Sequence, residues 1–182
     1  MGIDATAIVQ ASAWVKPSDE SASLLAEHPA TSLLRQKFGA AIIALVTFRG
    51  ETTILVDRHY IVEILTFLRD EPTLTFTSLA DIACCDWLGH EPRFEISYHL
   101  LSMARRDRLR IKVGVPESNL ELPSVTAVWL GANWFEREIF DLFGLTFVGH
   151  PDLRRILLPD DWVGYPLRRD EAIGGEEVAF TS

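Results

Sequence analysis

Hydrophobic positions recur at two spacings along this 182-residue chain, and they predict helices alternating with strands. From residue 21, helical spacing predicts two short helices, separated at His28-Pro29 because the residue before a proline avoids the helical region. Gly39 is a suitable end for the second of these helices. Apolar stretches at 42–48 and 52–56, joined by a short turn, then predict a β-hairpin.

A helix and a strand are expected after this hairpin. Asp57 is placed to cap a helix in which apolar residues recur over 60–68, and Pro72 ends it. The stretch 79–86 is apolar and predicts a buried strand. It contains the adjacent Cys84-Cys85, which have neither the usual disulfide geometry nor metal-ligand spacing. We interpret them as reduced thiols, which indicates a reducing, cytosol-facing location.

Strict alternation predicts a second antiparallel pair at 93–103 and 109–115, with one face in the core and one in water. The connector at 104–108 is expected to be a hairpin loop. Five basic residues form the main basic patch of the chain, on and beside this loop: Arg105, Arg106, Arg108, Arg110 and Lys112. We interpret the patch as a solvated hairpin tip, with a partner contact as the alternative.

A last helix is predicted to begin at Asn133, with Glu136 completing a capping box, and to end at Gly144. The predicted order is therefore α-β-β-α-β-β-β-α. Helices segregated from strands in this way indicate an α+β, two-layer fold, in which the helices pack on one face of a mixed or antiparallel sheet.

The chain divides into three parts by composition. Residues 1–20 are expected to form a flexible tail, 21–147 an α+β domain and 148–182 an extended C-terminal arm. The arm is rich in proline and glycine, yet it carries Trp162 and Tyr165, which disordered tails usually lack. It either docks on a partner subunit or wraps its own domain, and composition does not separate the two.

Composition and charge exclude several classes of protein. With 48% hydrophobic residues the chain can form one core, and its net charge of -9 makes nucleic acid a poor partner. The longest largely apolar run, 40–48, is far shorter than the roughly 20 residues of a membrane span. Residues 1–20 lack the pattern of a secretory leader, so none is expected.

Candidate catalytic groups are few. Glu138 and Asp141 share a face of the last helix and fit an acid–base pair, although a charged stripe explains them as well. His150 and Asp152 are the nearest approach to a metal cluster, and a His-Pro-Asp turn explains them equally. No glycine-rich phosphate loop opens into a helix. The chain therefore reads as a structural subunit without a reactive site.

One long motif resembles the signature of a known family. The segment EREIFDLFGLTFVGHPDLRRIL, which begins at Glu136, is similar to that of the 30 kDa subunit of respiratory complex I, the NADH-quinone oxidoreductase. The hairpin around 91–115 and the segment 154–170 resemble the same family. The residues that we assign to the family signature and to a partner interface are Glu136, Arg137, Glu138, Asp141, His150, Arg154, Arg155, Trp162 and Tyr165.

The resemblance implies a non-catalytic subunit of the hydrophilic arm of a proton-pumping NADH-quinone oxidoreductase, needed for assembly and for the junction near the quinone site. It implies no cofactor in this chain, with FMN and iron–sulfur clusters in partner subunits. The expected partners are other peripheral-arm subunits, especially the hydrogenase-like large subunit of the 49 kDa type. The implied location is peripheral, on the cytoplasmic side of the bacterial inner membrane or the matrix side in mitochondria.

A geometric hypothesis follows for the last helix. Glu136, Arg137, Glu138 and Asp141 are expected to face outward, where Arg154 and Arg155 pair with some of them, while Trp162 and Tyr165 enter partner pockets. Two alternatives stay open. The chain is the equivalent subunit of a related membrane-bound hydrogenase, or of a complex with another electron donor. Otherwise it is a free-standing enzyme using Glu138 and Asp141.

Overall fold

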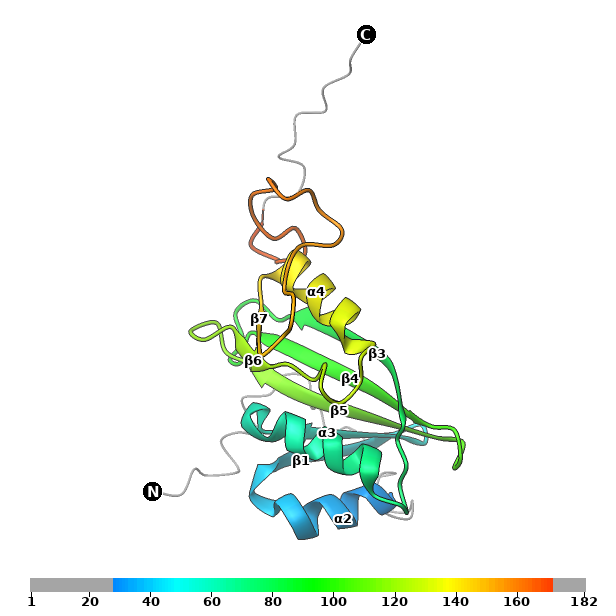
Figure 1. Cartoon of the computed structure of the whole chain (residues 1–182). Coiled ribbons are helices and arrows are strands. Elements are labelled where there is room, and N and C mark those ends of the chain that lie inside the picture. The colour runs from blue at the N-terminus through cyan, green and yellow to red at the C-terminus, as the bar shows by residue number, and fades with distance from the viewer. Residues whose placement is uncertain (1–27, 172–182) are drawn as a thin grey trace.

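Five strands form one sheet in the computed structural model, which describes residues 28–171 (Figure 1). They are β1 (Ile42–Phe48), β2 (Glu51–Val56), β3 (Ser78–Asp86), β4 (Phe94–Ser102) and β5 (Asp107–Val115). Their order in space is β1-β2-β5-β4-β3, and every neighbouring pair is antiparallel except the central pair β2–β5. The predicted mixed sheet is therefore confirmed, with its parallel pairing at the centre.

Three helices pack against the sheet: α2 (Pro29–Phe38), α3 (Ile61–Asp70) and α4 (Ala132–Phe143). In Figure 1, α3 and α4 both lie in front of it. The side chains beneath them, such as Ile54, Ile96 and Ile111, are completely buried in the main core. The prediction of two layers with the helices on one face is confirmed.

Local signals set two of the predicted helix boundaries. α2 ends at Phe38, directly before Gly39, as expected. The Asp57 carboxylate accepts a hydrogen bond of 2.9 Å from the His59 N–H and caps the short 3-10 turn Arg58–Tyr60 that leads into α3. Another 3-10 turn, Gly39–Ala41, links α2 to β1.

The capping box predicted for α4 is wrong. The helix begins at Ala132, its N-cap is Gly131, and no side chain caps it. Asn133 lies inside the helix, and Glu136 is buried against a different segment. The predicted stop is confirmed, because Gly144 adopts a left-handed conformation (φ 74°) that closes the helix.

The strand that contains the cysteines lies at an edge of the sheet. The prediction that it is buried is wrong, because α4 covers only one face of β3, and Ala80, Asp81 and Cys85 are exposed. Cys84 is half-buried, and both cysteines are free. Burial raises the pKa of both thiols, most strongly that of Cys84, and this favours the protonated form.

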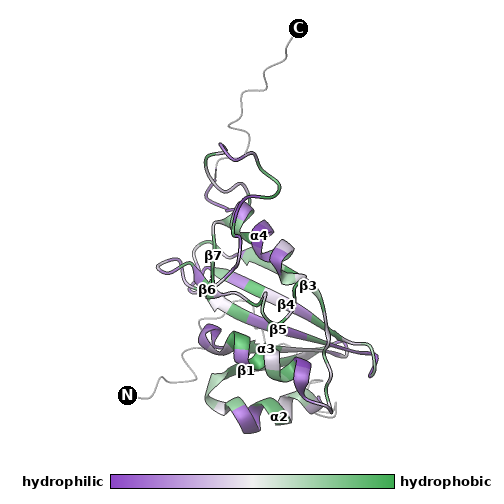
Figure 2. Ribbon diagram, viewed as in Figure 1, coloured by the Kyte–Doolittle hydropathy of each residue, from purple (hydrophilic) through white to green (hydrophobic). Residues whose placement is uncertain are grey.

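Hydrophobic and hydrophilic residues alternate along β4 and β5, as Figure 2 shows. Phe94, Ile96 and Tyr98 are all in the core, as predicted. The opposite face is drier than expected at one point, because Glu95 is buried beside Lys112, whose Nζ lies 2.6 Å from the Glu95 carboxylate.

Two three-residue strands lie outside the predicted order. β6 (Glu121–Pro123) and β7 (Thr146–Val148) pair in parallel and bring together the segments before and after α4. Three residues carry no measurable period, so the sequence pattern missed both strands.

After β7, residues 149–171 form loops beyond the C-terminal end of α4 (Figure 1), and this segment is called the C-terminal loop below. The expected extended arm is thus looped in its described part. The predicted tail at 1–20, the helix before His28 and residues 172–182 lie outside the described residues. No helix within residues 28–171 has the length and apolar character needed to cross a bilayer.

Candidate functional site

Asp141, near the C-terminal end of α4, is completely buried and binds the C-terminal loop. Its Oδ2 accepts hydrogen bonds from the backbone N–H groups of Ile156, Leu157 and Leu158, at 2.9, 2.7 and 2.9 Å. Its Oδ1 lies 2.7 Å from Nη1 of Arg155. Burial alone raises the pKa of this carboxyl, but the hydrogen bonds outweigh it and lower the pKa to about 2. Asp141 is therefore an ionised anchor for this loop.

Arg155 joins the helix to the far side of the C-terminal loop. Its guanidinium donates to the Asp141 carbonyl oxygen at 3.0 Å and to the carbonyl oxygens of Trp162 and Gly164 at 3.1 and 3.3 Å. The Tyr165 ring centroid lies 5.6 Å from the same guanidinium. One side chain thus fixes two separate stretches of the loop, as the planar fork of arginine allows.

Arg137 supports the start of the same loop from the preceding turn of α4. Its Nε donates to the carbonyl oxygen of Arg154, and its Nη2 donates to that of Arg155, both at 3.1 Å. The guanidinium also lies 5.4 Å from the ring of the exposed Trp134. Arg137 therefore acts as a donor to backbone rather than as a surface charge.

Glu136 binds the segment that precedes α4. Its carboxylate accepts hydrogen bonds of 2.6 Å from the Ser124 hydroxyl and from the Val125 N–H, and the side chain is completely buried. Burial raises the pKa of Glu136 to about 7, although these two hydrogen bonds act in the opposite direction. This carboxyl thus titrates near neutral pH.

The expectation that this helix presents an outward charged stripe is wrong for three of its four members. Glu136, Arg137 and Asp141 are buried, and only Glu138 is exposed. The reason is that segments without any periodicity, before and after the helix, cover the side of α4 that faces away from the sheet. Charge on the outer side of an amphipathic helix was therefore misread as solvent contact.

The geometry also contradicts an acid–base pair at Glu138 and Asp141. Both oxygens of Asp141 are already used, and its pKa is lowered, whereas that mechanism needs a raised one. The raised carboxyl is Glu136, which is enclosed by its own chain. Across residues 28–171, no three His, Cys, Asp or Glu side chains are grouped as metal ligands would be.

The remaining predicted residues lie along the C-terminal loop. His150 and Asp152 form the expected turn, in which the Asp152 N–H donates to His150 Nδ1 at 3.0 Å. The predicted intrachain pairing is confirmed for Arg155 and wrong for Arg154, whose Nε lies 3.0 Å from the exposed Asp152 carboxylate. Trp162 is half-buried.

Tyr165 packs on its own chain, where a partner pocket was expected. A Cβ atom at Gly144 would lie only 2.6 Å from its ring, and Arg168 lies 4.5 Å from the ring centroid on the loop side. Arg168 also donates to the Phe143 carbonyl oxygen at 2.6 Å, and the Leu167 N–H donates to that of Leu142 at 3.2 Å. The loop thereby satisfies carbonyl groups that the end of a helix leaves unpaired.

A second cluster, centred on Arg93, was missed by sequence reasoning. The buried Arg93 guanidinium makes two hydrogen bonds to Asp86 (2.9 and 2.8 Å), two to Asp170 (3.0 and 2.6 Å) and one to Glu117 (2.6 Å). Hydrogen bonds from Asp86 and then Asp170 raise the pKa of Arg93 further above its usual value. The Arg169 N–H also donates to Asp86, at 2.9 Å. This cluster fixes the end of the C-terminal loop to the edge of the sheet.

Fixed in this way, the C-terminal loop exposes large apolar side chains. Val163 is 93% exposed, Leu157 61% and Leu167 50%, while the backbone around them is bound to Asp141, Arg155 and Arg168. Ordered apolar groups of this kind are typical of surfaces that contact another protein. The arrangement is suited to binding a partner, and it offers no group for chemistry.

Comparison with known proteins gives consistent matches. A family described as the respiratory-chain NADH dehydrogenase 30 kDa subunit matches residues 54–177. A protein of Roseiflexus sp. (strain RS-1), named as the NADH-quinone oxidoreductase subunit designated C, is 51% identical over 81% of this chain and 85% of its own length. One of the same name from Geobacter metallireducens is 49% identical over 78% of this chain and 87% of its own.

A solved structure agrees with these sequence matches. It is described as the trypsin-resistant fragment (1-134) of Nqo5, and it superimposes with a TM-score of 0.59 at 31% identity. The match covers 68% of this chain and 98% of that fragment.

Proposed function

Because this chain belongs to the family of the respiratory-chain NADH dehydrogenase 30 kDa subunit, we propose that it is a non-catalytic structural subunit of a proton-pumping NADH-quinone oxidoreductase. Its relatives are named as one subunit of that enzyme, so its partners are other subunits of the same complex. Its role is to support assembly of the hydrophilic arm and the junction near the quinone site.

The observation that carries this proposal is the C-terminal loop. A loop with three exposed apolar side chains, fixed by a buried carboxylate and two buried or half-buried arginines, is costly to form for its own sake. A pre-ordered loop binds a partner with less loss of conformational entropy than a flexible one. The family signature from Glu136 to Arg155 is thus explained as the part that shapes a binding surface.

The finer assignments belong to the same proposal. The large hydrogenase-like subunit is the partner for this loop, and FMN and the iron–sulfur clusters reside in other subunits. The chain itself carries none of these cofactors and performs no turnover alone. It attaches to the membrane only through the complex, on the cytoplasmic side in bacteria or the matrix side in mitochondria.

Substitutions at the loop surface test the proposal. Removing everything after Gly149 would strip Asp141 of all its partners, so Leu157→Asp and Val163→Asp are the better variants. Each is introduced into a strain that lacks the native subunit, beside Tyr60→Asp, an exposed aromatic position in the 3-10 turn before α3. Co-purification with the other subunits and NADH-quinone reductase activity of membranes are measured.

We expect the two loop variants to lose co-purification and membrane activity while the melting temperature of the isolated chain stays unchanged, and the Tyr60 variant to behave like wild type. The subunits that co-purify with the wild type also identify the electron donor module, which distinguishes NADH from another donor or a hydrogenase. Turnover by the isolated chain, or an intact active complex without it, would contradict the proposal.

A further inference from the structure

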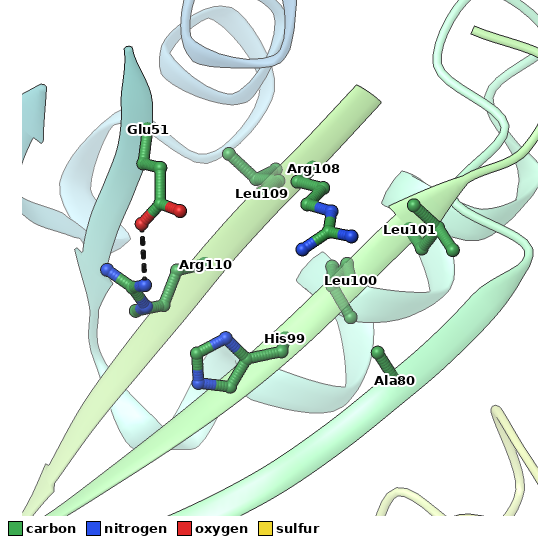
Figure 3. Close-up of a pocket in the computed structure, with 8 residues that line it drawn as sticks. All are labelled: Glu51, Ala80, His99, Leu100, Leu101, Arg108, Leu109 and Arg110. Atoms are coloured by element: carbon green, nitrogen blue, oxygen red, sulfur yellow. Dashed lines mark hydrogen bonds and ion pairs between the residues drawn. The ribbon is translucent and has the colours of Figure 1, made fainter. Parts of the chain in front are cut away.

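The sheet face that lies away from the helices carries basic side chains at one end of β4 and β5. His99 pairs with Arg110 across these strands, and Leu101 pairs with Arg108. Because side chains two apart on a strand share a face, Arg108 and Arg110 project together and His99 lies beside them. Figure 3 shows the three side chains around a common space.

These side chains line a cavity of about 140 Å³. Leu101 and Ala80 contribute apolar surface to it, and Arg108, Arg110, His99 and Glu51 contribute polar groups. Apolar walls exclude water, which strengthens any ion pair formed within. The cavity is small, so it suits one side chain rather than a cofactor.

The polar groups of the cavity are unequally satisfied. Arg110 already binds Glu51 at 2.9 Å and the Thr53 hydroxyl at 3.2 Å. Arg108, in contrast, makes no hydrogen bond or ion pair with any residue of the described range 28–171, and His99 makes none there either. An exposed guanidinium beside an unpaired imidazole is therefore available for an incoming group.

His99 is suited to donate one hydrogen bond. Burial, and then the charge of Arg110, lower the pKa of its imidazole, which leaves the ring neutral near pH 7 with a single N–H. The carboxylates nearest to this region have their own neighbours: Asp81 pairs with His99 across β3 and β4, and Asp107 lies 3.0 Å from His28. Arg108 is thus a cation without a matched anion in a chain of net charge -9.

We infer that this cavity binds a single carboxylate side chain, Asp or Glu, from another protein subunit. Arg108 forms the ion pair and the His99 N–H is the second donor, while the apolar walls contact the methylene groups of the incoming residue. The inference rests on the proposed function, which places the chain in a complex of several subunits. It adds a contact on the face of the sheet opposite to α4.

The charges favour a protein over a membrane or a nucleic acid. Lipid headgroup binding typically uses clusters of about 4–8 basic residues. Here Arg108 and Arg106 are the exposed arginines without a partner in the described part of this hairpin, and Glu51 and Asp81 lie close to the cavity. A site that offers one free guanidinium matches one carboxylate.

The test uses the full chain in a strain that lacks the native subunit. Arg108→Glu is compared with Arg106→Glu, which makes the same change of charge two residues away, outside the cavity. A photo-crosslinking amino acid at Leu101 is activated in the assembled complex, and the captured peptide is sequenced. The melting temperature of each isolated variant is measured as a control for folding.

We expect Arg108→Glu to lower incorporation at least tenfold, Arg106→Glu to lower it less than twofold, and neither to shift the melting temperature. The captured peptide contains Asp or Glu, and replacing that acid by Lys restores the Arg108→Glu variant. Equal effects of the two variants, no effect of either, or crosslinks only to lipid or nucleic acid overturn the inference. If the wild-type chain itself fails to co-purify, the proposed function fails instead.

Discussion

Arg155 and Asp141 lie fourteen residues apart and are joined twice, because the same Nη1 atom donates to the Asp141 carboxylate at 2.7 Å and to its carbonyl oxygen at 3.0 Å. The pair links helix α4 to the C-terminal loop and is buried on the carboxylate side. It determines where the exposed Leu157 and Val163 are placed, and thus links buried chemistry to a binding surface.

Asp141→Asn should destabilise the chain by about 2–4 kcal/mol, because an amide cannot accept all the hydrogen bonds that the carboxylate accepts in a buried site. Chemical denaturation monitored by fluorescence measures this. Glu138→Gln, an exposed change on the same helix, is the matched control and should stay within about 0.5 kcal/mol. The depressed pKa of Asp141 stabilises the fold above pH 3.8, and this contribution is lost as pH falls toward 2, in wild type alone. Equal stabilities of the two variants would refute the anchor role.

Gly144→Ala should be more destabilising than Gly50→Ala. Both glycines have positive φ (74° and 81°), so both variants incur backbone strain of about 1 kcal/mol. Only at Gly144 does the added Cβ meet the Tyr165 ring, at 2.6 Å, whereas nothing lies within 4 Å at Gly50. Differential scanning calorimetry measures the two melting temperatures. Adding Tyr165→Ala should remove the excess cost of Gly144→Ala, and a persistent excess would show that the ring is not responsible.

Asp86→Asn should be much more harmful than Asp170→Asn, although both carboxylates bind Arg93. The Asp86 side chain is 1% exposed and also accepts the Arg169 N–H, whereas that of Asp170 is 47% exposed. Loss of a buried partner leaves the Arg93 charge uncompensated, which costs about 3–5 kcal/mol, and an exposed pair contributes about 1 kcal/mol or less. Equilibrium unfolding and limited proteolysis of the C-terminal loop measure both effects. Comparable losses for the two variants would argue against this ranking.

Glu136→Gln should flatten the dependence of stability on pH between about 4.5 and 7. In that range the folded chain keeps a proton on Glu136 that the unfolded chain has released, so the free energy of unfolding of wild type decreases as pH rises. The full effect is about 3 kcal/mol at most. Unfolding curves at pH 5 and pH 8 give the difference between variant and wild type, from which other titrations such as that of His99 cancel. A difference that does not change with pH would mean that Glu136 has an ordinary pKa.

The repeating elements of the fold were predictable because their signals are local. The hairpin of β1 and β2, the alternation of β4 and β5 and the stop of α4 at Gly144 each depend on neighbouring residues. β3 was misjudged because a continuous apolar run does not reveal that only one of its faces is covered.

The candidate site was predictable in its members and not in its geometry. The sequence motif contains Asp141 and Arg155, and the pair exists. Whether Glu136 and Arg137 face water depends on loops that have no period, so the helical pattern could not decide it. Arg93 and Asp170 are 77 residues apart, and no local rule connects two such positions. A charged residue at the start of an apolar strand was the one available signal for Arg93.

The parallel pairing of β2 with β5 has a consequence for how the chain acquires its structure. Val56 of β2 pairs with Val113 of β5, so the centre of the sheet closes only after two further strands and a helix have been synthesised. Contacts between distant parts of a chain slow folding, because loop closure costs entropy before the contact stabilises anything. The amino-terminal hairpin therefore waits on the ribosome with one edge unpaired, and the subunit becomes a finished building block only once residue 115 has emerged.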